Sequence, residues 1–227
     1  MFNNIFGSGD SIETTILNIL VVVIPALLCI TIHELSHGFT AYRLGDRTAK
    51  DMGRLTLNPI KHIDPIGLLM MIIFRFGWAK PVPVNMYTFK HPKRYMAVTA
   101  LAGPLSNIIM ALVAMFIYGL LAMRIGFMPS TVASEFVRDL LLNIIGFNIM
   151  LAVFNMLPIP PLDGSKILFS LLPEKNYYTL MRYERFGMIL LIVAINTPVF
   201  RSFMGQITGT LFNSFLIVGN AAFRLVN

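Results

Sequence analysis

The chain has 227 residues, of which 56% are hydrophobic and 13% charged, and its formal net charge is +7. Soluble domains carry about one quarter charged residues, so this composition excludes an ordinary soluble protein and favours a membrane protein in contact with the lipid bilayer. The basic residues lie between apolar blocks rather than along one stripe, so we expect no nucleic acid among its partners.

Long apolar blocks organise the chain. About 20 apolar residues cross a hydrocarbon layer of roughly 30 Å. The candidate blocks, in chain order, are residues 15–44, 95–123, 136–156, 186–200 and 204–223. A further block, 66–78, is short and contains Arg75, so we interpret it as re-entrant or interfacial and leave open whether it spans. The sequence predicts an all-α polytopic membrane protein with five to six transmembrane helices.

Two short segments between the first two spans have strand character. Residues 54–58 alternate in polarity, and residues 81–85 carry two prolines, which confine that segment to a sheet edge or an extended loop. We therefore expect a small β-sheet or hairpin beside the membrane. Such strands could pair with another extended peptide segment by strand addition.

No repeat or soluble domain interrupts the chain, so we predict a single domain over residues 1–227, with a core at about 15–175 and additional helices at about 186–224. Lys and Arg gather after the first and third spans, and basic loops stay in the cytoplasm. We therefore expect a multi-pass protein of the plasma membrane with its N-terminus outside. Five spans would place the C-terminus inside.

Residues 33–37 read H-E-L-S-H, an H-E-x-x-H pattern on a predicted helix. Residues at i and i+4 share one helix face, so His33 and His37 can bind one zinc ion while Glu34 acts on a bound water. A chance match is the alternative. However, ionisable groups in a membrane helix cost about 2.5–3.5 kcal/mol each, which favours a functional site.

A catalytic zinc needs a third protein ligand, and Asp163 is the best candidate. It follows a proline-rich segment at the cytoplasmic end of the third span, on the side to which His33 and His37 point. The alternative is a helix-capping Asp before Gly164. Gly103 and Pro104, near the start of the second span, could permit close helix approach or a kink near the site, and ordinary packing in a membrane helix is the alternative.

These motifs together resemble the site-2 protease family of intramembrane zinc metalloproteases, in its compact prokaryotic form without appended domains. The resemblance rests on H-E-L-S-H at 33–37, A-G-P-L-S-N at 102–107 and N-M-L-P-I-P-P-L-D-G at 155–164, in that order. The segment G-R-L-T-L-N-P at 53–59 is also typical of the family. The similarity covers residues 15–175.

The resemblance implies cleavage of transmembrane segments of membrane protein substrates, usually after another protease has removed their outer part. It implies one Zn²⁺ per chain held by His33, His37 and Asp163, with Glu34 as general base and acid. Asn107 and Asn155 match family asparagines that hold substrate or stabilise the oxyanion. From the residues alone, Asn107 could instead pair helices, and Asn155 could satisfy backbone groups near the prolines.

Two other functions are compatible with the sequence. A family member could keep the fold and bind a membrane partner without cutting it, as a scaffold. A metal transporter also uses membrane histidines and carboxylates, but no second metal cluster is evident. The substrate, the cleavage site, a regulatory membrane partner and the oligomeric state are not determined by the sequence.

Overall fold

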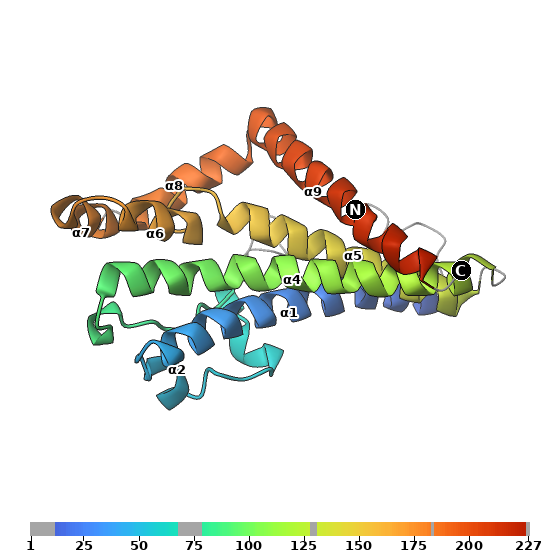
Figure 1. Ribbon diagram of the computed structural model, residues 1–227, viewed down its shortest axis with the longest axis horizontal. Coiled ribbons are helices and arrows are strands. Elements are labelled where there is room, and N and C mark those ends of the chain that lie inside the picture. Colours follow the sequence, from blue (N-terminus) through green and yellow to red (C-terminus); the bar gives the residue numbers. More distant parts are fainter. Residues whose placement is uncertain (1–11, 68–78, 128–130, 183, 226–227) are drawn as a thin grey trace.

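The computed structural model describes residues 12–67, 79–127, 131–182 and 184–225. Its helices are arranged as Figure 1 shows. In chain order they are α1 (Ile12–Arg43), α2 (Thr48–Asp51), α4 (Pro92–Phe127), α5 (Val132–Asn155), α6 (Asp163–Ser170), α7 (Glu174–Arg182), α8 (Glu184–Ile195) and α9 (Pro198–Arg224), with short 3-10 turns at Pro59–His62 and Met86–Thr88. Most of the predicted segment 66–78 lies outside the described residues.

Three long helices form the body of the molecule. α1, α4 and α5 are each long and apolar enough to cross a membrane, and they pack against one another (Figure 1). Glu13 in the first turn of α1 and Arg43 in its last turn complement the helix dipole. Thr131 begins α5 with a capping box, since its hydroxyl accepts a hydrogen bond from Ser134 N–H at 3.2 Å. These helices coincide with the first three predicted spans, which confirms an all-α membrane protein.

The buried core lies where α4 and α5 meet α9. Ala111 and Met115 of α4 and Ile145 and Ile149 of α5 are almost fully buried there. Residues of α9, among them Leu211, pack against this cluster. The core therefore holds α4, α5 and α9 together.

The last two predicted spans do not form two separate crossings. α8 has 12 residues and is about 18 Å long, which is too short for a layer of roughly 30 Å. It bends by 83° into α9. The bend lies at Asn196–Pro198, where Pro198 lacks an N–H group and Thr197 caps the new helix by accepting a hydrogen bond from Phe200 N–H at 3.2 Å. The described helices provide three spans, or four if α8 and α9 form one broken span.

α9 runs parallel to α4. Gly119, late in α4, packs so closely against Gly219, late in α9, that a Cβ at Gly119 would collide with the Gly219 backbone. The C-terminal end of α9 therefore lies beside the end of α4 and the start of α5 (Figure 1). The predicted placement of the C-terminus opposite the N-terminus rested on five spans, and the described helices do not confirm that number.

The predicted flanking sheet is not formed by the described residues, in which one isolated antiparallel bridge joins Ile63 to Ala79. Pro81 and Pro83 cannot donate ladder hydrogen bonds, and Val82 N–H bonds to the side chain of Glu34. Residues 54–58 contain a tight turn, because Thr56 N–H donates a hydrogen bond of 3.1 Å to the Arg54 carbonyl. Side-chain bonds from Arg54 to the carbonyls of Lys80 and Pro81 join the two segments instead.

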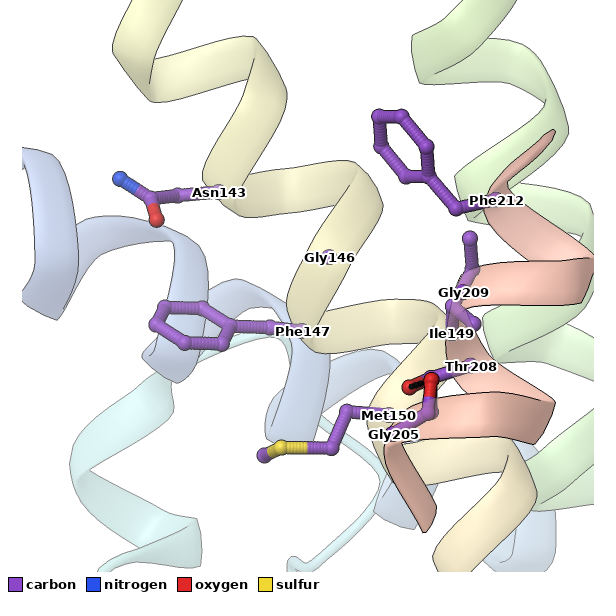
Figure 2. Close-up of a pocket in the computed structure, with 9 residues that line it drawn as sticks. All are labelled: Asn143, Gly146, Phe147, Ile149, Met150, Gly205, Thr208, Gly209 and Phe212. Carbon is purple, nitrogen blue, oxygen red and sulfur yellow. Dashed lines mark hydrogen bonds between the residues drawn. The ribbon is translucent and has the colours of Figure 1, made fainter. Parts of the chain in front are cut away.

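A cavity of about 320 Å³ opens between α5 and α9 (Figure 2). Its lining is mostly apolar and includes Gly146, Met150, Gly205 and Phe212. It contains none of the predicted metal ligands. We interpret it as an incompletely filled gap between two helices rather than as the reaction site.

Candidate metal centre

His33 and His37 lie one turn apart on α1 and face the interior of the bundle. Their exposed fractions are 5% and 8%, and their Nε2 atoms are 3.0 Å apart. Their rings are nearly perpendicular, at 87°. The helical spacing thus brings both imidazoles to one point, as the H-E-x-x-H pattern predicts.

Asp163 approaches the same point from the first residue of α6. Its Oδ2 atom lies 3.2 Å from His33 Nε2 and 3.1 Å from His37 Nε2, and its side chain is buried. Leu162, not Asp163, occupies the capping position of α6. A Cβ at Gly164 would collide with the carbonyls of Met156 and Leu157, so the D-G pair lets the chain fold tightly onto the end of α5.

The hydrogen bonds of the two histidines fix which nitrogen faces the site. His37 Nδ1 lies 2.7 Å from the Thr99 carbonyl, and a carbonyl can only accept, so Nδ1 carries the proton. His33 Nδ1 lies 2.5 Å from Asn107 Oδ1, which likewise accepts. In the neutral rings both Nε2 atoms therefore present lone pairs to the Asp163 carboxylate.

This donor set fits a zinc ion. Three acceptor atoms with edges of 3.0, 3.1 and 3.2 Å cannot satisfy one another, and buried Asp163 Oδ2 accepts no hydrogen bond among the described residues. Zinc with ligands at 2.0–2.1 Å in a tetrahedron has ligand–ligand edges of roughly 3.3 Å. Two imidazoles and one carboxylate also leave a fourth position open, as catalytic zinc requires.

Glu34 is half-buried on the neighbouring face of α1. Its Oε2 atom accepts a hydrogen bond of 2.8 Å from Val82 N–H. The proline-flanked segment 81–85 thus lies directly against this carboxylate. The sequence did not predict this contact, which joins residues 48 positions apart.

The two predicted asparagines occupy different environments. Asn107 on α4 is fully buried and contacts His33, whereas Asn155 at the end of α5 is half-buried and donates a hydrogen bond to the Leu151 carbonyl of its own helix. The structure therefore brings together His33, His37, Asp163 and Asn107. It records no contact between Asn155 and the three metal-ligand candidates.

Gly103 is a site residue whose role sequence reasoning missed. A Cβ at this position would collide with the imidazole of His37 and come within 2.7 Å of His33 Cε1. Gly103 lies one turn before Asn107 on α4, so the i, i+4 rule could have placed both on the face that meets the histidines. Thr99, which orients His37, lies one further turn earlier on the same face.

Comparison with known proteins decides the family. Residues 21–195, most of the chain, match the family model described as Peptidase family M50. The chain belongs to this site-2 protease family. It is an intramembrane zinc metalloprotease, which confirms the function expected from the sequence.

Individual relatives agree with this membership. The chain is 41% identical over 178 residues, 78% of its length and 80% of the relative, to the Bacillus subtilis protein named "Putative zinc metalloprotease YwhC". It is 30% identical over 183 residues, 79% and 68% of the two lengths, to "Putative zinc metalloprotease Rip2" of Mycolicibacterium smegmatis. It is 35% identical over 105 residues, 45% and 49% of the lengths, to "Putative zinc metalloprotease MJ0611" of Methanocaldococcus jannaschii. No solved structure matches significantly.

Proposed function

We propose that this protease hydrolyses peptide bonds in the transmembrane segments of membrane protein substrates, using one Zn²⁺ per chain held by His33, His37 and Asp163. The observation that carries the proposal is the convergence of these three ligand atoms within 4.8 Å of one another, inside a bundle of helices long enough to span a membrane. A bound zinc ion would supply Lewis acidity towards the scissile carbonyl and acidify a water molecule.

Glu34 is the proposed general base and acid. Its carboxylate takes a proton from the attacking water and passes it to the nitrogen of the leaving amine. The bond from Val82 N–H holds Oε2 and leaves Oε1 available for this transfer. Loss of such a group lowers the rate by about 10²–10⁴-fold.

The substrate must be unwound before its peptide bonds become accessible, and the chain supports two contacts for this step. Residues 81–85 lie beside Glu34, and the carbonyl groups of Val82, Pro83 and Val84 are suited to main-chain pairing with an extended substrate. Asn155 is a second proposed substrate-binding residue, because its side chain is only half-buried and so remains accessible. An apolar cavity of about 400 Å³ between α4, α5 and α9, lined in part by Met156 and Leu157, gives an apolar segment a route to this end of the bundle.

We further propose that the protein lies in the plasma membrane, with the N-terminus outside and the site toward the cytoplasmic side, and that it acts in regulated proteolysis with or without a membrane partner. Lys and Arg residues cluster at the end of α1 and before α4, close to the site. A non-cleaving scaffold is the second candidate. The complete set of acid–base and ligand side chains favours the protease.

Cleavage of a purified single-span substrate in detergent tests the proposal, with the products mapped by mass spectrometry. We expect a cut within the apolar segment, about 10²–10⁴-fold slower in Glu34→Gln. Glu135→Gln is the matched control, because Glu135 is an exposed carboxylate in the first turn of α5. Glu34→Gln cleaving as fast as the wild type would exclude this mechanism, and zinc binding without cleavage of any substrate would favour the scaffold.

A further inference from the structure

A chain of buried amides leads from α5 to the zinc-ligand candidate His33. Asn107 on α4 and Asn148 on α5 both have exposed fractions of 0%. Asn107 Nδ2 lies 2.7 Å from Asn148 Oδ1 and 3.3 Å from the carbonyl of Cys29 on α1. Asn148 thus contacts no ligand directly but touches the residue that does.

Two backbone carbonyls fix the direction of every hydrogen bond in this chain. Asn148 Nδ2 lies 2.8 Å from the Ile144 carbonyl, which can only accept, so Asn148 Oδ1 must face Asn107. That oxygen and the Cys29 carbonyl both accept from Asn107 Nδ2, so Asn107 Oδ1 must face His33 Nδ1. The amide orientation follows from the network itself.

The orientation matters because it selects the tautomer of His33. With Asn107 Oδ1 as acceptor, the proton resides on Nδ1 and Nε2 is free to bind a metal. If the Asn107 amide turned over, its NH₂ group would face Nδ1 and the proton would move to Nε2, toward Asp163. Without the acceptor at Asn148, Asn107 Nδ2 keeps only the Cys29 carbonyl at 3.3 Å and the weakly accepting Cys29 sulfur at 3.2 Å as partners, so the turned orientation is penalised less.

We propose that Asn148 is a positioning residue of the metal centre, which acts through Asn107 to hold His33 in its metal-binding tautomer. The inference rests on the proposed zinc site. Its consequence is that zinc affinity depends on a side chain on α5 that does not reach the metal. Outer partners of metal-bound histidines typically change metal affinity by about 10–100-fold when they are removed.

A neighbouring asparagine separates this role from ordinary helix packing. Asn143 lies on the same helix, is 94% buried, and donates a hydrogen bond of 3.2 Å to the Val21 carbonyl of α1. Figure 2 shows its amide turned away from α9 and towards α1. Asn143→Leu therefore removes a comparable buried helix–helix hydrogen bond without touching His33.

The experiment measures zinc affinity by chelator competition, the visible spectrum of the Co²⁺-substituted protein, and the unfolding temperature of the metal-free protein. We expect Asn148→Leu to weaken zinc binding by about 10–100-fold and to change the Co²⁺ spectrum. We expect Asn143→Leu to leave the zinc affinity and the Co²⁺ spectrum unchanged. It should lower the unfolding temperature of the metal-free protein about as much as Asn148→Leu does.

Other results would overturn the proposal. Wild-type zinc affinity in Asn148→Leu, or an equal loss in Asn143→Leu, would show that Asn148 only packs helices. If Asn148→Leu does not fold, Asn148→Ser serves instead, because its hydroxyl is too short to reach Asn107 and the same loss of affinity is expected. A wild-type protein that binds no zinc would refute the proposed metal site itself, whereas wild-type zinc binding that is insensitive to Asn148 would refute this inference alone.

Discussion

The two histidines of the metal centre are oriented by hydrogen bonds to the ring nitrogens that face away from the site. His33 and His37 direct their Nε2 atoms to Asp163 because each Nδ1 is held by an acceptor, Asn107 Oδ1 or the Thr99 carbonyl. Both acceptors lie on α4. The relative placement of α1 and α4 therefore decides whether the two imidazoles converge.

Gly103 allows that close placement, and Gly103→Ala tests it. The added Cβ would collide with the imidazole of His37, and overpacking of this kind costs about 1–3 kcal/mol. A displacement of about 1 Å at a reacting group can cost roughly 10²-fold in rate. We expect cleavage and zinc affinity to fall by at least about tenfold, measured on purified protein.

Gly146→Ala is the matched control for this substitution. A Cβ at Gly146 would meet nothing within 4 Å, although it also lies within a membrane helix. We expect wild-type zinc affinity in this variant. Equal losses in both variants would mean that the effect reflects helix composition and not contact with the histidines.

The ligands could be predicted from sequence because they follow from short-range rules and a family motif. The i, i+4 spacing places His33 and His37 on one face, and the order of the motifs indicates Asp163. Gly103 and Asn148 could not be assigned in the same way. Their roles depend on the rotation of α4 and α5 about their axes, which packing determines and no spacing within one helix specifies.

At the scale of elements, a buried carboxylate ties together the loops beside the site. Asp46, after α1, is fully buried and accepts hydrogen bonds from Thr48 N–H at 3.0 Å and Asn85 N–H at 2.6 Å. Burial raises the pKa of Asp46, but the hydrogen bonds from Thr48 and Asn85 outweigh it and hold the pKa below its usual range. Asn85 ends the segment that contacts Glu34, so Asp46 anchors that segment to α1.

Asp46→Asn should therefore destabilise the protein at neutral pH. Hydrogen bonds to charged groups are worth about 1.5–3 kcal/mol each, and we expect a loss of about 1–3 kcal/mol. Because the folded pKa is depressed, the stabilisation exists above the unfolded pKa and is lost as the pH falls through the folded pKa. The gap in unfolding temperature between wild type and variant should narrow accordingly in acid.

Asp51→Asn is the control for this measurement. Asp51, at the end of α2, is exposed, and substitutions at such surface positions usually change stability by less than about 0.5 kcal/mol. We expect an almost unchanged unfolding temperature. If the unfolding temperatures of the wild type and Asp46→Asn differed by the same amount at neutral and acid pH, the charge of Asp46 would not be what stabilises the fold.

The sequence predicted the long helices better than their connections. Apolar length is a property of one segment and was sufficient for α1, α4 and α5. The connections depend on which hydrogen-bond partner each backbone group finds. This holds for the bend before Pro198 and for residues 54–58 and 81–85, which are described and form no strand. Val82 N–H bonds to Glu34, a partner supplied by the tertiary fold.

For the whole molecule, the direction of α9 determines the topology. Because α9 runs parallel to α4, we expect the C-terminus on the same side as the start of α5 and opposite α7. Cys29 is the single cysteine and is buried, so introduced cysteines can be labelled selectively. Leu225→Cys and Val132→Cys, both at exposed positions, should react with an impermeant maleimide added outside intact cells, and Glu174→Cys should not.

Permeabilised cells provide the control, because all three cysteines should then be labelled. Labelling of Glu174→Cys but not of Leu225→Cys in intact cells would invert the proposed orientation. Labelling of Val132→Cys without Leu225→Cys would restore the five-span arrangement.

The most direct test of the central claim is zinc K-edge X-ray absorption with metal quantification on the purified protein, in the wild type, Glu34→Gln and Asp163→Ala. The metal centre described above predicts one zinc per chain bound by two imidazole nitrogens and a carboxylate oxygen, retained in Glu34→Gln and largely lost in Asp163→Ala. A wild-type protein without zinc, or an unchanged zinc environment in Asp163→Ala, would contradict it.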